Sequence, residues 1–250
     1  MSEVLLERVG PVAILTLNAP DRRNAFTPEM VQELLDACDS IEADPGVGAV
    51  VLQARGDSFC SGAHRAVLAE AGKDPVSSAN YRRLGRTYQA FVRVGELQPP
   101  TVAAVRGHAV GAGVNLMLAT DLRVVAHGAR IMTGFLRIGI HPGGGHFTLL
   151  GRTVGRETAA AMSVFGQEID GRKAVELGMA WESVEESEVE ARALALATVA
   201  GADPELARAT AHSFRVELGP PAIPWTAALE VEKAVQMWSL RRREERSPGG

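Results

Sequence analysis

Short aliphatic runs alternate with amphipathic stretches along the first half of the chain. The runs are rich in Val, Ile, Leu and Ala, which is typical of strands that are buried on both faces. They occupy residues 12–17, 48–54, 101–107 and 121–126. Because stretches with helical periodicity separate these runs, the pattern predicts parallel strands joined by helices, which is an α/β fold.

Start and stop signals place further elements around these runs. Residues 4–17 predict a hairpin, and Thr27 is a predicted helix N-cap because a proline follows it in the first helical position. A charged helix is predicted over residues 81–96. From about residue 145 onward the pattern is almost entirely helical. The predicted helix boundaries in that region are the Gly-Arg pairs at 151–152 and 155–156.

Composition and charge narrow the class of protein. The chain has 250 residues, of which 46% are hydrophobic and 22% charged, and its formal net charge is −4. This charge argues against nucleic acid or a membrane surface as a partner. The longest uncharged stretches, residues 107–120 and 138–151, are too short to span a bilayer. With no secretory signal pattern and no paired cysteine motif, we expect a cytoplasmic protein with reduced thiols.

Two loops place small residues where a predicted strand gives way to a helix. They are FCSGAH at residues 59–64 and AVGAGVN at residues 109–115. Small residues allow backbone N–H groups to approach a ligand, and the first N–H groups of a helix have no partner within it. Two facing turns of this kind can hold an oxygen that becomes negative during a reaction. Tight packing alone also explains small residues, so spacing leaves both interpretations open.

Further motifs accompany these two loops. They are PDRRNAF at 20–26, VRGHAVGAGVNLMLATDLRVVA at 105–126, IGIHPGGG at 138–145 and GRKAVELGMA at 171–180. Together, in this order, they resemble the crotonase, or enoyl-CoA hydratase/isomerase, superfamily. The resemblance implies a spiral of ββα units over residues 1–195 and a C-terminal helical trimerisation region at 196–250. It also implies an acyl-CoA thioester as the ligand and a homotrimer or dimer of trimers as the assembly.

The resemblance implies roles for individual residues. The thioester carbonyl is expected between the backbone N–H groups of Ala63 and Ala112. The residues expected to contact coenzyme A are Arg22, Arg23, Ala25 and His64. Cationic side chains suit phosphate, although a solvated basic loop is the alternative for these arginines. The residues expected to line the substrate pocket are Gly62, Gly111, Phe135, Pro142, Gly143 and His146. No metal and no cofactor besides the coenzyme A of the substrate are predicted.

The sequence departs from the superfamily at two positions that matter for chemistry. Hydratases of this kind use two glutamates to handle water, and the matching positions here are Asn115 and Phe135. Neither side chain exchanges a proton near neutral pH. Asn115 is expected to bind either a ligand or water, or the nearby loop backbone. Four of the six histidines lie in the motif loops, so a histidine base is a hypothesis, with His141 as the catalytic candidate.

These observations lead to one functional prediction and two alternatives. We expect an enoyl-CoA hydratase/isomerase-type lyase of divergent mechanism, in which two backbone N–H groups stabilise the thioester oxyanion. The first alternative is a protein that binds acyl-CoA without turnover. The second is a histidine-dependent decarboxylase or hydrolase of acyl-CoA. The sequence does not identify the acyl group.

Overall fold

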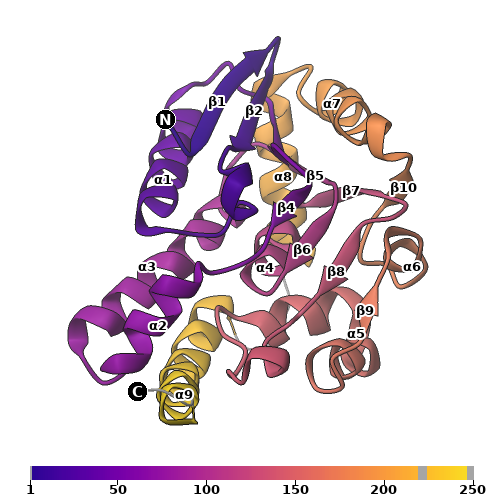
Figure 1. Cartoon of the computed structure of the whole chain (residues 1–250). Coiled ribbons are helices and arrows are strands. Elements are labelled where there is room, and N and C mark those ends of the chain that lie inside the picture. Colours follow the sequence, from indigo (N-terminus) through magenta and orange to yellow (C-terminus); the bar gives the residue numbers. More distant parts are fainter. Residues whose placement is uncertain (1, 219–223, 247–250) are drawn as a thin grey trace.

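The computed structural model describes residues 2–218 and 224–246 of the chain (Figure 1). The strands are β1 (Val4–Val9), β2 (Val12–Leu17), β3 (Ala49–Ala54), β4 (Ser58–Cys60), β5 (Thr101–Val105), β6 (His108–Val110), β7 (Leu122–Ala126), β8 (Arg130–Met132), β9 (Glu168–Ile169) and β10 (Glu182–Val184). The α-helices are α1 (Pro28–Ala43), α2 (Arg65–Lys73), α3 (Ser78–Gly95), α4 (Ala112–Leu118), α5 (His146–Ser163), α6 (Gly171–Glu176), α7 (Val189–Ala200), α8 (Pro204–Leu218) and α9 (Trp225–Arg246). Short 3₁₀ turns are η1 (Pro20–Arg22), η2 (Leu136–Ile138) and η3 (Glu186–Glu188).

Two strands followed by helix recur along the first part of the chain. The successive units begin at β1, β3, β5 and β7, and their helices are α1, then α2 with α3, then α4, then α5. From the second unit onward, the first strand joins a larger sheet of order β1-β2-β3-β5-β7-β10, and the second joins a smaller sheet of order β4-β6-β8-β9. Figure 1 shows β4, β6 and β8 side by side near the centre of the view. The predicted α/β fold, with its ββα repetition, is confirmed.

The pairing of the strands follows from their sequences. β1 and β2 form an antiparallel hairpin, and β2, β3, β5 and β7 pair in parallel. All six side chains of β2 and all five of β5 are buried, as expected for parallel strands that helices cover. Helix α7 packs across β3, β5 and β7. Among the described helices, none has both the length and the apolar character needed to cross a bilayer.

Several predicted ends of helices are confirmed, whereas other predicted helix ends and strand positions differ from the structure. The Thr27 hydroxyl accepts the Met30 amide at 3.1 Å, so Thr27 is the N-cap of α1. Gly155, with φ 75° and ψ 170°, interrupts α5 as predicted, whereas Gly151 lies inside that helix and is no boundary. Strands β4 and β6 lie in segments read as loops, because three residues are too few to show an alternating pattern.

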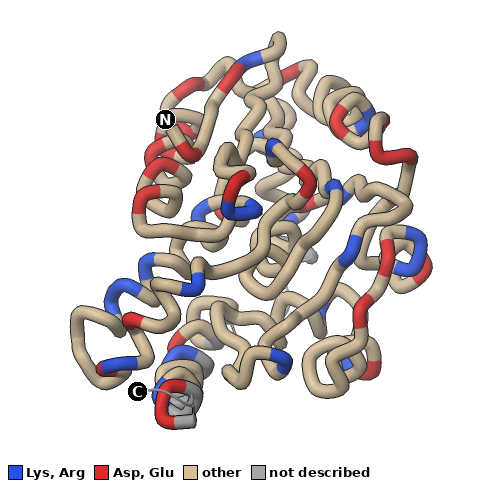
Figure 2. Tube along the Cα trace, in the orientation of Figure 1, with Lys and Arg blue, Asp and Glu red and all other residues tan. Residues whose placement is uncertain are grey.

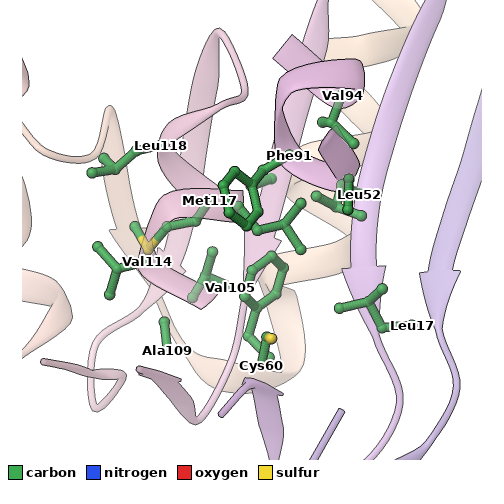
Figure 3. Packing of buried hydrophobic residues seen from close by; sticks show 14 of the residues in the cluster. Leu17, Leu52, Cys60, Phe91, Val94, Val105, Ala109, Val114, Met117 and Leu118 are labelled. Atoms are coloured by element: carbon green, nitrogen blue, oxygen red, sulfur yellow. The ribbon is translucent and has the colours of Figure 1, made fainter. Parts of the chain in front are cut away.

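The core lies where the second and third units meet. Figure 3 shows Phe91 of α3, Val105 of β5, and Val114 and Met117 of α4 converging. All four side chains are buried. Charged positions, in contrast, are spread over the outer helices and loops with both signs interspersed (Figure 2). This packing holds α4 against β4 and therefore fixes the start of α4 beside the loop that follows β4.

The start of α4 approaches the end of β4 through backbone atoms. A Cβ atom added to Gly113 would lie 2.1 Å from the carbonyl oxygen of Cys60. A Cβ atom added to Gly62, where φ is +90°, would lie 2.8 Å from the carbonyl oxygen of Val110. Side chains at these two positions would therefore push the loops apart, so glycine is required at both.

We predict that Gly113→Ala destabilises the protein by about 1–3 kcal/mol or more, because the added methyl group meets a backbone carbonyl that cannot move aside. Gly151→Ala is the matched control, since a Cβ atom at Gly151 meets nothing within 4 Å. That substitution should be neutral or stabilise the helix by up to about 1 kcal/mol. Urea unfolding of both variants measures the difference. Equal stabilities would contradict the packing described here.

Candidate active site

A cavity of about 840 Å³ is lined by both of the small-residue loops. Further walls come from η1, α2, α3, the segment around η2, and one residue of α9. The predicted site residues that line it are Arg22, Arg23, Ala25, Gly62, Ala63, His64, Gly111, Ala112, Phe135 and Gly143. The structure therefore brings together residues that are more than a hundred positions apart in the sequence. Four predicted site residues, Asn115, His141, Pro142 and His146, do not line the cavity.

The backbone N–H group of Ala63 points away from Phe26, the residue with which Ala63 pairs. Ala63 forms a parallel bridge with Phe26. The bridge uses the Gly62 carbonyl, which accepts the Phe26 amide at 2.8 Å, and the His64 amide, which donates to the Phe26 carbonyl at 3.0 Å. In an extended segment, the N–H group of the residue between them lies on the opposite edge. The Ala63 amide is thus directed away from Phe26, on the side where β4 pairs with β6.

Ala112 is the first residue of α4. The Gly111 carbonyl accepts the amides of Val114 and Asn115 at 3.0 and 3.2 Å, which closes the first turn of the helix. The Ala112 amide belongs to the first turn and has no acceptor within the helix. A Cβ atom on Gly62 would lie only 3.4 Å from the Ala112 nitrogen, so the two loops are adjacent here. Within the described residues, neither the Ala63 nor the Ala112 amide donates a hydrogen bond.

The loop after η1 is held in place by a buried asparagine. Arg23 and Asn24 have positive φ angles of 54° and 52°. The Asn24 side chain accepts the Ala19 amide at 2.7 Å and donates to the carbonyls of Arg55 and Ser58 at 2.9 and 2.8 Å. These bonds offset the cost of the left-handed backbone and fix the loop against the start of β4.

The exposed part of the cavity wall is rich in positive charge. Arg23, Arg65 and Arg137 are exposed, and Arg22 is half-buried and forms an ion pair with Glu3. Asp21 is the one acidic residue among the described lining residues. His64 caps α2, since its Nδ1 accepts the Ala66 amide at 3.3 Å. When His64 is neutral its proton therefore lies on Nε2.

Asn115 and His146 form a buried pair behind the cavity wall. Both side chains are 0% exposed. Asn115 donates from Nδ2 to the Gly143 carbonyl at 3.0 Å, which turns its Oδ1 toward His146 Nδ1, 2.7 Å away. Because Oδ1 only accepts, Nδ1 of His146 must bear the proton. The His146 ring meets the edge of Phe135, with centroids 4.9 Å apart. The alternative role foreseen for Asn115, binding the loop backbone, is the one seen here.

Burial determines the protonation state of His146. It lowers the pKa of His146 to about 3, because the charged imidazolium is disfavoured away from water. His146 is therefore neutral at physiological pH. His141 lies elsewhere: it is half-buried, its Nδ1 is 2.6 Å from the Pro142 carbonyl, and its ring meets Phe147. Within the described residues, no group of three or more His, Cys, Asp or Glu side chains is placed to hold a metal ion.

Sequence reasoning missed several polar residues of the wall, among them Tyr88 of α3 and Gln236 of α9. Tyr88 lies one helical turn after Leu84 and therefore looks like part of an apolar stripe. Gln236 is a single amide in the last helix, 93 positions after Gly143. Only the way in which α9 packs on α2 and α3 brings it to the cavity.

Comparison with known proteins connects this site to a family. The sequence model of the family described as enoyl-CoA hydratase/isomerase matches residues 7–239. A relative named probable enoyl-CoA hydratase, from Mycobacterium tuberculosis, is 40% identical over 220 residues, which cover 88% of this chain and 84% of that protein. The 1,2-epoxyphenylacetyl-CoA isomerase of Escherichia coli is 32% identical over 192 residues, covering 74% of this chain and 71% of that protein.

A solved structure agrees with the observed fold. An enoyl-CoA hydratase/isomerase from Xanthobacter autotrophicus superposes with a TM-score of 0.88 at 30% identity, covering 96% of this chain and 90% of that chain. The crotonase-like fold that the motifs implied is thereby confirmed.

We predict that the neutral state of His146 makes the protein acid-sensitive. The folded-state pKa of about 3 lies below the usual 6.5, so between these pH values unfolding takes up a proton. The stability that neutral His146 contributes is therefore fully present above pH 6.5 and decreases as the pH falls toward 3. At pH 4.5 the loss from this residue should reach about 2–3 kcal/mol. His146→Gln, which does not titrate, should lose less stability between pH 7 and 4.5 than the wild type does.

The control for this measurement is His212→Gln, because His212 is exposed on α8. Denaturant unfolding at several pH values gives the three curves. If the wild type and His146→Gln lose stability in parallel, burial of a neutral His146 is wrong.

Proposed function

We propose that this chain, which belongs to the enoyl-CoA hydratase/isomerase family, binds an acyl-CoA thioester and catalyses a reaction through the enolate of that thioester. The observation that supports this most is the position of two backbone amides. Ala63 and Ala112 both line one cavity, and neither amide donates a hydrogen bond within the described residues. The thioester oxygen would accept both N–H groups.

The chemistry follows from this contact. Two N–H donors withdraw electrons from the thioester carbonyl, so the α-carbon becomes more acidic and the β-carbon more electrophilic. In the enolate the oxygen bears the charge, and fixed donors stabilise it more than they stabilise the neutral carbonyl. Losing one donor of such a pair typically costs about 3–4 kcal/mol of transition-state stabilisation. The geometry therefore suits double-bond shift, addition and decarboxylation equally well.

Four arginines of the cavity wall, Arg22, Arg23, Arg65 and Arg137, form what we call the basic rim, and this rim would orient the bound ligand. Arg22 and Arg23 lie at the end of η1, beside the loop that carries Ala63, and Arg65 follows that loop at the start of α2, where all three suit the phosphates of coenzyme A. Nε2 of His64 can donate to the same groups. With the nucleotide at this rim, the acyl group points inward, toward the wall formed by α2, α3 and α9.

Proton transfer must differ from that of a two-glutamate hydratase. Asn115 is engaged with Gly143 and His146, and Phe135 has no polar atom. A histidine with a pKa of about 3 is a poor base at neutral pH, so His146 is unsuited to the task. The catalytic role expected of His141 stays a prediction. Of the histidines considered as bases, His64 is the one that lines the cavity.

A second function, binding without turnover, is supported by one specific observation. Among the described lining residues the only carboxylate is Asp21, which is exposed at the rim. A site without a carboxylate near the reacting carbons loses the 10²- to 10⁴-fold that general acid–base catalysis contributes. Such a protein would still hold acyl-CoA through the amides and the basic rim.

We predict that Ala112→Pro strongly weakens thioester activation, because proline has no N–H group and is tolerated in the first position of a helix. Incubation with 2-enoyl-, 3-enoyl- and malonyl-type CoA thioesters, followed by mass analysis, measures turnover. The variant should lose about 10²- to 10³-fold in kcat.

Ala112→Gly keeps the amide and is the control, with activity expected within a few-fold of the wild type. Circular dichroism and thermal unfolding verify that both variants fold. Wild-type binding without any product would favour the second function, and full activity of a folded Ala112→Pro variant would rule out the amide as a donor.

A further inference from the structure

The cavity has a buried inner part in addition to its basic rim. The side chains of Leu68 on α2, Leu84 on α3 and Ile140 after η2 line this inner part. All three are buried, whereas three of the four rim arginines are exposed. An acyl group that extends inward from the rim therefore meets carbon atoms on this wall, which favours the burial of its CH₂ groups.

Tyr88 of α3 and Gln236 of α9 close the inner part where the two helices meet. The Tyr88 hydroxyl donates to Oε1 of Gln236. Both residues line the cavity, although each is only 4% exposed. Because the two side chains touch, they bridge the space between α3 and α9, and an acyl chain that reaches them must stop there.

The loop after Pro142 closes the same end from another side. A Cβ atom on Gly143 would lie 2.5 Å from the Tyr88 hydroxyl and closer still to Oε1 of Gln236. A Cβ atom on Gly144 would lie 2.9 Å from the ring of Phe91, which also belongs to α3. The backbone of this loop is therefore packed directly onto α3 and onto the Tyr88–Gln236 contact. Since a methyl group does not fit there, an acyl chain does not fit either.

Helix α9 contacts α3 at a second place that lies outside the cavity wall. The Lys233 ammonium lies 4.1 Å from the centre of the Tyr81 ring, and the Tyr81 hydroxyl donates to Glu230 at 2.9 Å. None of these three described residues lines the cavity. The α3–α9 contact can therefore be weakened at Tyr81 without changing the surface that a ligand would touch.

We propose that Tyr88, Gln236 and Gly143 form a floor that limits the length of the acyl group. The floor acts by its bulk, so the space between it and the Ala63 and Ala112 amides determines how many carbon atoms fit. This inference rests on the proposed function, because it takes the thioester to lie at those amides with its acyl group pointing inward. The preferred ligands are CoA thioesters of short apolar acyl groups and not of long-chain fatty acyl groups.

Titration calorimetry with saturated CoA thioesters, from acetyl- to dodecanoyl-CoA, tests the floor. Each additional CH₂ group that is buried should tighten binding about fourfold. This gain should stop at the chain length that reaches the floor, which we call the limit, and longer chains should bind no more tightly. An affinity that rises without a limit through dodecanoyl-CoA would overturn the proposal, and so would an affinity that does not depend on chain length.

Two substitutions that remove part of the floor should move the limit to longer chains. Two CH₂ groups beyond the wild-type limit, Tyr88→Ala should bind the thioester at least about tenfold more tightly than the wild type does. Gln236→Ala should move the limit in the same direction but less far, because an amide is smaller than a phenol ring. Circular dichroism and thermal unfolding verify that each variant folds. A folded variant of either kind that keeps the wild-type limit would contradict the floor.

Tyr81→Ala is the matched control. It removes another aromatic ring from the contact between α3 and α9, two helical turns before Tyr88, and leaves the cavity wall unchanged. Its limit should equal that of the wild type. A shift as large as that of Tyr88→Ala would attribute the effect to looser packing of the helices and would refute the floor.

The wild-type series separates this inference from the proposed function. If the folded wild type binds none of the thioesters, the proposed function fails and this inference fails with it. If the wild type binds them without a limit, the inference about the floor alone is wrong.

Discussion

Residues 60–63 and 110–113 meet through backbone atoms, because Gly62 and Gly113 have no side chains to separate them. Helix α4 begins at this contact, and its packing against α3 and β4 holds it there (Figure 3). The same contact puts the amides of Ala63 and Ala112 on the wall of one cavity. Two adjacent strands of the smaller sheet, β4 and β6, thus bring two N–H groups from distant parts of the chain to one place, where they can act on one oxygen.

The Asn115–His146 pair adds a second layer of support behind that wall. Asn115 and Phe135, the two positions at which the resemblance to the superfamily implies glutamates, are a buried amide and a buried phenyl ring. The amide bonds the Gly143 carbonyl and a neutral imidazole, so the loop after η2 is tied to α4 without any charge. A neutral network of this kind stabilises the pocket but does not transfer protons. The proton must therefore be transferred by the ligand itself, by bound water or by a residue of the rim.

The sequence was sufficient to predict the features that depend on local pattern. The predicted strands 12–17 and 101–107 correspond to β2 and to β5, which ends at Val105. The N-cap at Thr27 is confirmed, and both small-residue loops line the cavity. Features that depend on distant contacts were not predictable in this way. Strands β4 and β6 are stabilised by pairing with each other and not by their own composition. Gln236 reaches the cavity only because α9 folds back over α2 and α3, and the depressed pKa of His146 follows from burial that no motif reveals.

The central claim is that the Ala63 and Ala112 amides polarise a thioester carbonyl, and the vibration of that carbonyl tests it most directly. Difference infrared spectroscopy on a CoA thioester labelled with ¹³C at the carbonyl isolates this one bond in the complex. The account predicts that the C=O stretch moves to lower frequency when the thioester binds, and that it returns toward the value in water in the Ala112→Pro variant. A thioester that binds with its carbonyl frequency unchanged from that in water would contradict the account.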